Sequence, residues 1–217
     1  MTRKVYPSKD QQELIFREIA DILGAVSSPV RVKLIHFLSQ GPLSVEVLAK
    51  KIDQTVANTS MHLRKMLASN VVEVTVQAQK RLYSLHPAMF DFWELCQNLV
   101  QEINPQLEMS ESQTHGDLGW NEPLKITIKM ARNNEVALID VRPEDEVIEA
   151  LDQINVINLP MEKISKSLNK LPKRKPILIF CRGRFCALSS QAVIELRKKG
   201  FKAYRLNESW YALKNAL

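Results

Sequence analysis

The sequence is poor in the residues that define several whole classes of protein. It has three cysteines in 217 residues, too few for a disulfide framework, and the odd count is typical of a reducing compartment where thiols stay free. No apolar run approaches the roughly 18 residues of a membrane-spanning helix. The first residues, MTRKVYPSKDQQE, lack the apolar segment of a signal peptide. We therefore expect a cytoplasmic protein that does not span a membrane.

Candidate metal ligands are also scarce. The four histidines are scattered without the short, regular spacings of a metal site. Cys96 lies among large apolar residues in a helical pattern, where a free thiol usually packs as a small hydrophobic group. We expect no metal and no cofactor.

Positive charge is in excess, and it is unevenly distributed. The net charge is +6, yet residues 1–103 carry 12 basic and 10 acidic residues, and residues 104–121 carry three acids and no base. Residues 122–217 hold 18 bases against 11 acids. The excess lies mostly in the half that contains Cys181, where it fits an anionic small substrate as well as it fits nucleic acid.

The segment 104–121 is polar, contains glycine and proline, and has no apolar periodicity. It is typical of an interdomain linker. We therefore predict two domains, at 1–103 and 122–217. The fold class that the patterns favour is a mainly α winged helix-turn-helix followed by an α/β domain with a mainly parallel sheet.

In the first half, apolar spacing and cap residues predict helices and two strands. The helices are expected at about 10–26, 29–40, 44–52 (capped by Ser44), 55–69 and 87–103, and the strands are VVEVTVQ and RLYSL. Two short helices followed by a hairpin form a helix-turn-helix with a wing.

The helix at 55–69 carries groups that base edges and phosphates accept. Acids are scarce between residues 54 and 90, as a DNA-facing surface requires, although a helical bundle with a solvated basic face would show the same pattern. The candidate DNA-binding residues are Asn58, Thr59, Ser60, Met61, His62, Arg64, Lys65, Lys80 and Arg81.

The stretches SPVRVKLIHFLSQGPLSVEVLAKKI and TVANTSMHLRKMLASNVVEV resemble the ArsR family of winged-helix repressors over about residues 15–100. The resemblance implies a homodimer, paired through terminal helices, that reads a palindromic DNA operator. Metal-sensing members carry a cysteine pair in the third helix, where this chain has residues 44–48, SVEVL. The departure argues against metal sensing.

The second half alternates between strands and helices. The strand-like runs are VALIDV, INVINL, PILIFC and AYRL, and helical patterns at 124–133 and 187–199, two shorter stretches and a C-terminal tail separate or follow them. Cys181 ends the third run, at the tip of a buried strand. The loop amides, Arg182, Gly183 and Arg184 then surround it, and we expect them to lower its pKa and make it a nucleophile.

The stretches ALIDVRPEDE (with Asp140 and Arg142), IFCRGRFCALSSQAV and RKKGFKAYRL resemble the rhodanese family of sulfurtransferases over about residues 124–217. The resemblance implies that Cys181 carries a persulfide and that the loop Arg182, Gly183, Arg184, Phe185 and Cys186 cradles it. The sulfur donor would be small, such as thiosulfate or a persulfide. Segments EALDQINVINLP and Leu206–Trp210 depart from the family pattern.

Cys186, five residues after Cys181, is close enough for a disulfide, although a small residue starting a helix would look the same. Three functions remain open. The chain could be a DNA-binding regulator whose rhodanese-like domain transfers or senses sulfane sulfur. It could be a sulfurtransferase whose winged helix only dimerises. It could also be a redox-sensing repressor that uses a Cys181–Cys186 disulfide. Sulfurtransferase activity is favoured but not decided by the sequence.

Overall fold

The structure is a computed structural model of the chain. It describes residues 8–77, 80–106, 117–147, 151, 153–184 and 186–217. The chain divides into two compact units, one of residues 1–38 and 42–90 and the other of residues 39–41 and 91–217. The linker at 104–121 stays a prediction.

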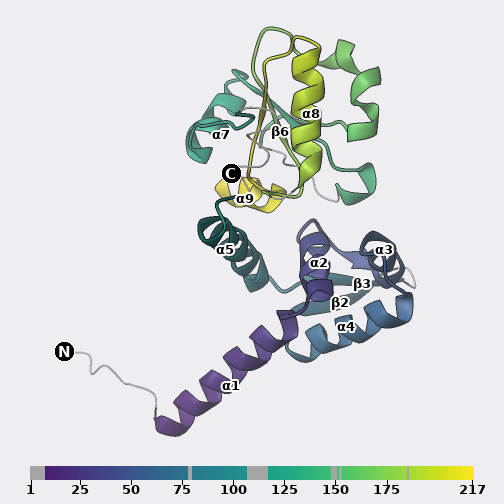
Figure 1. Ribbon diagram of the computed structural model, residues 1–217, viewed down its shortest axis with the longest axis vertical. Coiled ribbons are helices and arrows are strands. Elements are labelled where there is room, and N and C mark those ends of the chain that lie inside the picture. Colours follow the sequence, from purple (N-terminus) through teal and green to yellow (C-terminus); the bar gives the residue numbers. More distant parts are fainter. Residues whose placement is uncertain (1–7, 78–79, 107–116, 148–150, 152, 185) are drawn as a thin grey trace, which may run out of the picture. The chain divides into compact units, whose positions relative to one another are not determined.

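The first unit has the predicted order of elements (Figure 1). Helices α3 and α4 follow one another, and the antiparallel hairpin of β2 and β3 comes next, so the winged helix-turn-helix is confirmed. The elements are α1 (Lys9–Val26), α2 (Pro29–Leu38), β1 (Leu43–Ser44), α3 (Val45–Lys51), α4 (Val56–Ala68), β2 (Val72–Gln77), β3 (Lys80–Leu85) and α5 (Ala88–Ile103), which continues into the second unit.

Side-chain caps fix where these helices begin. The Ser44 hydroxyl accepts a hydrogen bond from the Val47 amide, and the Thr55 hydroxyl accepts one from the Asn58 amide at 3.2 Å. Each cap satisfies a backbone donor that has no partner inside its helix. Sequence analysis missed β1, which pairs with Leu82 and Tyr83 of β3, because two residues are too few to show strand alternation.

The core of the first unit comes from α2, α3 and α4. Leu34, Leu38, Leu48, Leu63 and Met66 are all 1% exposed or less. Burial of these side chains therefore stabilises the packing of α2 and α3 against α4 and fixes the position of α4. The hydrophobic effect supplies this support at roughly 25 cal/mol for each Å² of apolar surface removed from water.

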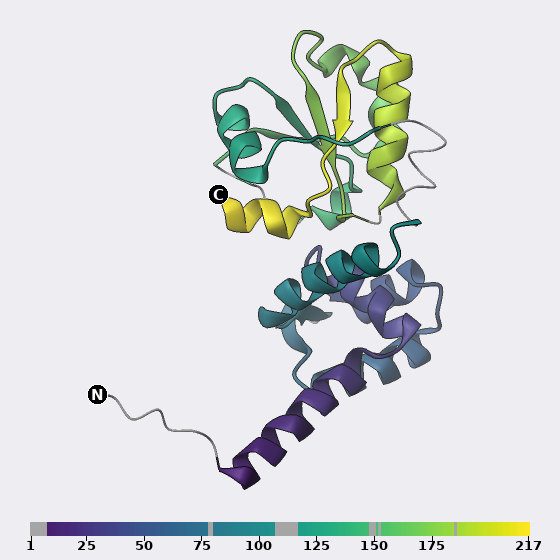
Figure 2. The same cartoon turned by 60° about the vertical axis from the view of Figure 1, so that its left-hand side comes forward.

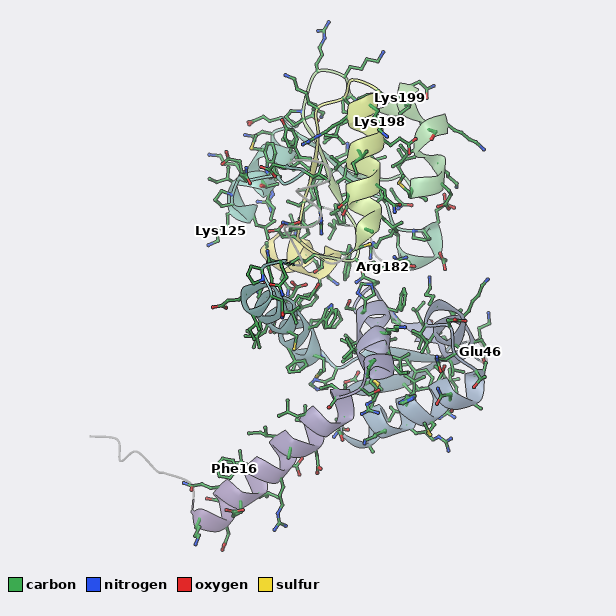
Figure 3. All side chains as sticks on the ribbon, in the orientation of Figure 1. Phe16, Glu46, Lys125, Arg182, Lys198 and Lys199 are labelled. Atoms are coloured by element: carbon green, nitrogen blue, oxygen red, sulfur yellow. The ribbon has the colours of Figure 1, made fainter. Side chains whose placement is uncertain are left out.

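Helix α1 contributes little to that core. Only Ala25 and Val26 of its 18 residues are buried. Figure 3 shows Phe16 standing away from the helix, and its side chain is 60% exposed. The other exposed apolar residues of α1 are Leu14, Ile15, Ile19, Ile22 and Leu23. Such a continuous apolar stripe is unusual on a surface that stays in water.

The second unit is the predicted α/β fold (Figure 2). Its four parallel strands lie in the order β5-β4-β6-β7. The elements are α7 (Leu124–Arg132), β4 (Ala137–Asp140), η1 (Glu144–Glu146), β5 (Val156–Asn158), η2 (Met161–Lys166), η3 (Leu168–Lys170), β6 (Ile177–Phe180), α8 (Ala187–Lys198), β7 (Ala203–Arg205) and α9 (Trp210–Ala216).

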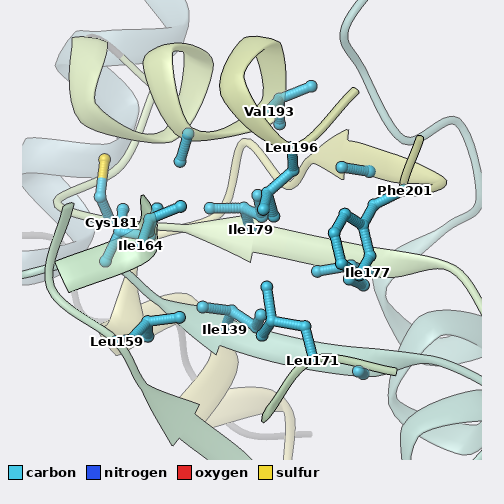
Figure 4. Close-up of a cluster of buried hydrophobic side chains, with 14 of the residues drawn as sticks. Ile139, Leu159, Ile164, Leu171, Ile177, Ile179, Cys181, Val193, Leu196 and Phe201 are labelled. Atoms are coloured by element: carbon cyan, nitrogen blue, oxygen red, sulfur yellow. The ribbon is translucent and has the colours of Figure 1, made fainter. Parts of the chain in front are cut away.

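Both faces of this sheet are covered. On one face, Ile139, Ile177 and Ile179 pack against α8, as Figure 4 shows. On the other, Leu138, Leu178 and Phe180 pack against residues of α7 and α9. Burial on two faces explains why the strands are continuous apolar runs in the sequence.

The segment between β5 and β6 differs from the expectation of a helix. It forms the short 3₁₀ helices η2 and η3 instead of an α-helix. Its sequence, MEKISKSLNK, mixes serine and asparagine with good helix formers, which weakens an α-helix.

In the part of the chain that the structure describes, no helix is both long enough and apolar enough to cross a membrane.

Candidate functional site

The cysteine loop joins the central strand β6 to α8. Cys181 directly follows Phe180, the last residue of β6, and α8 begins at Ala187. Gly183 has a φ of +106°, a conformation that side chains with a Cβ rarely adopt, and a Cβ there would meet the Ser209 Cβ at 3.5 Å. The Cys186 amide donates to the Gly183 carbonyl at 3.2 Å and closes the turn.

The Cys181 side chain lies in the apolar core below α8 (Figure 4). It is 1% exposed, and its sulfur is 3.5 Å from the Ser189 hydroxyl and 3.6 Å from the Cys186 carbonyl. Burial, followed by the interaction with Cys186, raises the pKa of the Cys181 thiol. The predicted lowering of this pKa is therefore wrong, because the side chain faces the core and not the loop cations.

The lowered pKa belongs to Cys186. The neighbouring Cys181 side chain lowers the pKa of Cys186 to about 6, against the opposing effect of burial. The amides of Arg182 and Leu188 and the charge of Arg182 lower it further. The Arg182 Nη1 atom lies 3.8 Å from the Cys186 sulfur. The Arg182 and Leu188 amides thus act on Cys186, whereas the Ser189 amide and hydroxyl lower the pKa of Cys181 without offsetting the effect of burial.

Glu146 holds Arg182 in this position. The guanidinium Nε and Nη2 atoms donate to the two Glu146 carboxylate oxygens at 2.6 Å and 2.7 Å. Glu146 is itself buried at 1% exposure, so this two-point ion pair is shielded from water. Sequence analysis missed Glu146 and Ser189. The only sequence signal for Glu146 is its place in the quoted stretch ALIDVRPEDE.

Arg184 and Phe185 complete the predicted loop. Arg184 is half-buried, and its carbonyl accepts a hydrogen bond from Arg205, which also donates to Ser190 at 3.0 Å. This contact ties the loop to the end of β7 and to α8. Phe185 lies outside the described residues.

Asp140 and Arg142 form a buried ion pair at the end of β4. The guanidinium donates to both carboxylate oxygens, with distances of 2.7–3.0 Å, and the two side chains are 3% and 1% exposed. Asn158 donates to both of their backbone carbonyls. Asp140 is the register partner of Phe180, so the pair lies one strand away from the cysteine loop. Its contacts point to a structural role, holding the strand ends that carry the loop.

The predicted DNA-binding residues share one helix and one hairpin but not one environment. Met61, Arg64, Lys65, Lys80 and Arg81 are exposed, and Asn58, Ser60 and His62 are half-buried. The Arg64 Nε atom donates to the Ser60 carbonyl at 3.4 Å, and the Asn58 amide donates to Gln54 at 2.6 Å.

Two of these residues are engaged inside the unit. Thr59 is completely buried and donates its hydroxyl to the Thr55 carbonyl, so it cannot reach DNA in this conformation. The His62 ring lies 3.3 Å from Arg31, and burial and then the Arg31 charge lower the pKa of His62. His62 is therefore neutral at neutral pH, and Thr59 is removed from the predicted surface.

Two family models match the chain. Residues 26–75 match a helix-turn-helix domain, and residues 125–216 match a rhodanese-like domain. Among curated proteins, the chain is 23% identical over 203 residues to the HTH-type transcriptional regulator Rv0324 of Mycobacterium tuberculosis (strain ATCC 25618 / H37Rv). The match covers 92% of this chain and 88% of that protein.

Solved structures resemble the first half. The homodimeric winged helix-turn-helix domain of Mb0332 from Mycobacterium bovis, a possible ArsR-family regulator, is 17% identical and has a TM-score of 0.43. That match covers 46% of this chain and 94% of the other. The repressor BigR from Xylella fastidiosa is 27% identical, with 45% and 96% covered and a TM-score of 0.36. The chain thus has the architecture of a transcription regulator, a helix-turn-helix DNA-binding domain fused to a rhodanese-like domain.

The lowered pKa of Cys186 predicts that one thiol of the loop ionises at mildly acidic pH. Ultraviolet thiolate absorbance followed against pH should show an inflection near pH 6 in the native protein. Arg182→Gln should raise that pKa by about 1 unit or more, because a neighbouring opposite charge is removed. The exposed Lys125→Gln is the matched control and should leave it unchanged. An inflection that survives Cys186→Ser would contradict the assignment.

Proposed function

We propose that this chain regulates transcription in response to sulfane sulfur. The winged helix binds a DNA operator as a homodimer, and the rhodanese-like domain receives sulfur on Cys181. The observation that carries the sulfur chemistry is the placement of Cys181 and Cys186 in one loop, with the Arg182 Nη1 atom 3.8 Å from the Cys186 sulfur and a lowered pKa for Cys186. A cytoplasmic location is part of this proposal, because a protein that binds the DNA operator needs access to it.

The sulfur transfer begins at the buried thiol. The Cys181 sulfur attacks the outer sulfur of thiosulfate, the sulfur–sulfur bond breaks, and sulfite leaves with the electron pair. The Cys181 proton passes to the neighbouring Cys186 thiolate, which acts as the general base. Arg182 supplies positive charge for the sulfite that leaves. Cys181 then carries a persulfide.

A second step connects transfer with redox sensing. The Cys186 thiolate, re-formed by loss of its proton, attacks the Cys181 sulfur, a Cys181–Cys186 disulfide forms, and hydrosulfide leaves. The oxidising equivalents come from the sulfane sulfur itself, so no other oxidant is needed. Sulfurtransferase activity and the disulfide state are then two outcomes of one loop. If an external thiol acceptor takes the outer sulfur before Cys186 attacks, the loop returns to its starting state.

DNA binding is supported by the helix-turn-helix domain and by the exposed cations on α4 and the hairpin. Arg64 and Lys65 on α4 and Lys80 and Arg81 on β3 are exposed, and Glu73 is an exposed acid on the neighbouring strand. Exposed cations on a reading helix and its wing supply the phosphate contacts that position such a domain.

The dimer is supported by the apolar stripe of α1. The six exposed side chains of this stripe, Leu14, Ile15, Phe16, Ile19, Ile22 and Leu23, have exposed fractions between 38% and 60%. A second copy of α1 offers the same stripe, and a two-fold axis would bury both.

The first prediction concerns DNA. Arg64→Ala with Lys65→Ala should weaken binding to duplex DNA and flatten its salt dependence by about 2 in slope per chain, because about one phosphate contact is lost with each cation. Fluorescence anisotropy over a series of KCl concentrations measures both. The control, Lys9→Ala with Arg17→Ala on α1, removes equal charge. Equal behaviour of the two variants would favour a sulfurtransferase whose winged helix only dimerises.

The second prediction concerns the dimer. Ile15→Glu with Ile22→Glu places two carboxylates on the α1 stripe, and analytical ultracentrifugation should then find monomers where the native protein sediments as a dimer. Burying an unpaired carboxylate in an apolar contact costs several kcal/mol. The control is Glu13→Gln with Glu18→Gln on the same helix. A dimer that persists in the stripe variant would show that another surface holds it.

The third prediction concerns sulfur. After prolonged thiosulfate treatment, intact mass spectrometry should find one added sulfur atom on Cys186→Ser protein, loaded more slowly because the proposed general base is missing, and none on Cys181→Ser protein. The native protein should accumulate the disulfide, and Cys96→Ser should behave like it, because Cys96 lies outside the loop. Sulfur retained on Cys181→Ser protein would refute Cys181 as the carrier.

A further inference from the structure

The second unit gathers basic side chains at the edge where its parallel strands begin. Register pairs align Ala137, Ile177 and Ala203, the first residues of β4, β6 and β7. The Ile177 amide donates to the Lys202 carbonyl at 2.8 Å, and the Ala137 amide donates to the Pro176 carbonyl at 2.9 Å. The segments that enter these strands therefore share one edge. We call six residues there the basic edge: Lys170, Lys173, Arg174, Lys198, Lys199 and Lys202.

The basic edge is not neutralised within the unit. All six side chains are exposed, and none forms an ion pair with a carboxylate in the described parts of residues 117–217. Glu135 is the exposed acid in the segment that enters β4, and it accepts a hydrogen bond from Asn133. Six like charges on one edge repel one another and attract an extended anion.

The cysteine loop does not account for these charges. Cys181 follows the last residue of β6, whereas the basic edge lies where β6 begins. Figure 3 shows Lys198 and Lys199 at one end of α8 and Arg182 near its other end. Arg182 and Arg184 are part of the cysteine loop itself. A small anion bound near Cys181 would thus leave the basic edge unused.

We propose that the basic edge is a second DNA-contacting surface, which binds the phosphate backbone of duplex DNA without reading its sequence. The six residues of the basic edge are five lysines and one arginine, and such side chains dominate phosphate contacts. The helix-turn-helix domain of the same chain brings a duplex to this surface at high effective concentration. The proposal rests on DNA binding by that domain.

A charge-matched pair of variants tests the proposal in the full-length protein. Lys198→Gln with Lys199→Gln removes two charges at the end of α8. Lys125→Gln with Lys129→Gln removes two exposed charges on α7, which covers the other face of the sheet. The probe is a labelled duplex of arbitrary sequence of about 40 base pairs, roughly four helical turns. Anisotropy titrations over a KCl series give the affinity and its salt dependence.

The edge variant should lower the slope of the salt dependence by about 2 per chain and weaken binding to the same degree whatever the sequence of the duplex. The α7 variant should match the native protein. Equal slopes of the salt dependence for the two variants would overturn the proposal. The basic edge would then be a candidate binding surface for an acidic protein. If the native protein binds no duplex at all, DNA binding by the helix-turn-helix domain is rejected too. Equal slopes with a native protein that does bind DNA reject only the second surface.

A second measurement needs no variant. Lysines of the native protein are acetylated with and without the duplex, and the extent is read by peptide mass spectrometry. DNA should protect Lys198, Lys199 and Lys202 at least threefold and leave Lys125 unprotected. Equal acetylation of the edge lysines in both samples would overturn the proposal even if the variants had folded poorly.

Discussion

The interaction between the Cys181 and Cys186 side chains, which raises the pKa of Cys181 and lowers the pKa of Cys186, is the one on which the proposed sulfur chemistry depends. It exists because β6 delivers Cys181 into the core, where a negative charge is costly, and the turn at Gly183 returns Cys186 to the amides at the start of α8. Glu146 keeps Arg182 beside the thiolate. The loop thus places a thiol of raised pKa next to a thiol of lowered pKa, the pairing that the proposed transfer uses.

Much of the fold could be predicted from the sequence, because caps and periodicity are local. Ser44 and Thr55 begin the helices where expected, and the apolar runs became the strands. The position of Cys181 at a strand tip was also predictable. The direction of its pKa shift was not predicted, although strand alternation places Cys181 on the same face as Ile177 and Ile179, which meets α8. Glu146 and Ser189 depend on contacts between distant segments, which a single sequence does not reveal.

In the parallel sheet of the second unit, different polar groups lie at the ends of the strands and at their starts. The strand ends carry the cysteine loop and the Asp140–Arg142 pair, and the strand starts carry exposed lysines. A parallel arrangement makes this separation automatic, since every strand points the same way. Sulfur chemistry and electrostatic attraction can therefore coexist in one small fold, with the thiolate kept away from the strongest positive field. The cation beside Cys186 is instead the single Arg182, which Glu146 holds in place.

Pairing through α1, as proposed above, would make the ordering of this helix depend on protein concentration. All seventeen residues from Ser8 to Gly24 are exposed in a single chain, so this part of α1 is stabilised mainly by the capping box at Ser8, by its own backbone hydrogen bonds and by the bond from Arg31 to the Gly24 carbonyl. Most of the stability of a helix in a protein comes from packing of its apolar face, which α1 lacks in a single chain. At low concentration α1 should fray, and association should drive its last ordering by mass action. The amount of protein in the cell would then set how much of it has a complete helix, independently of any signal from sulfur.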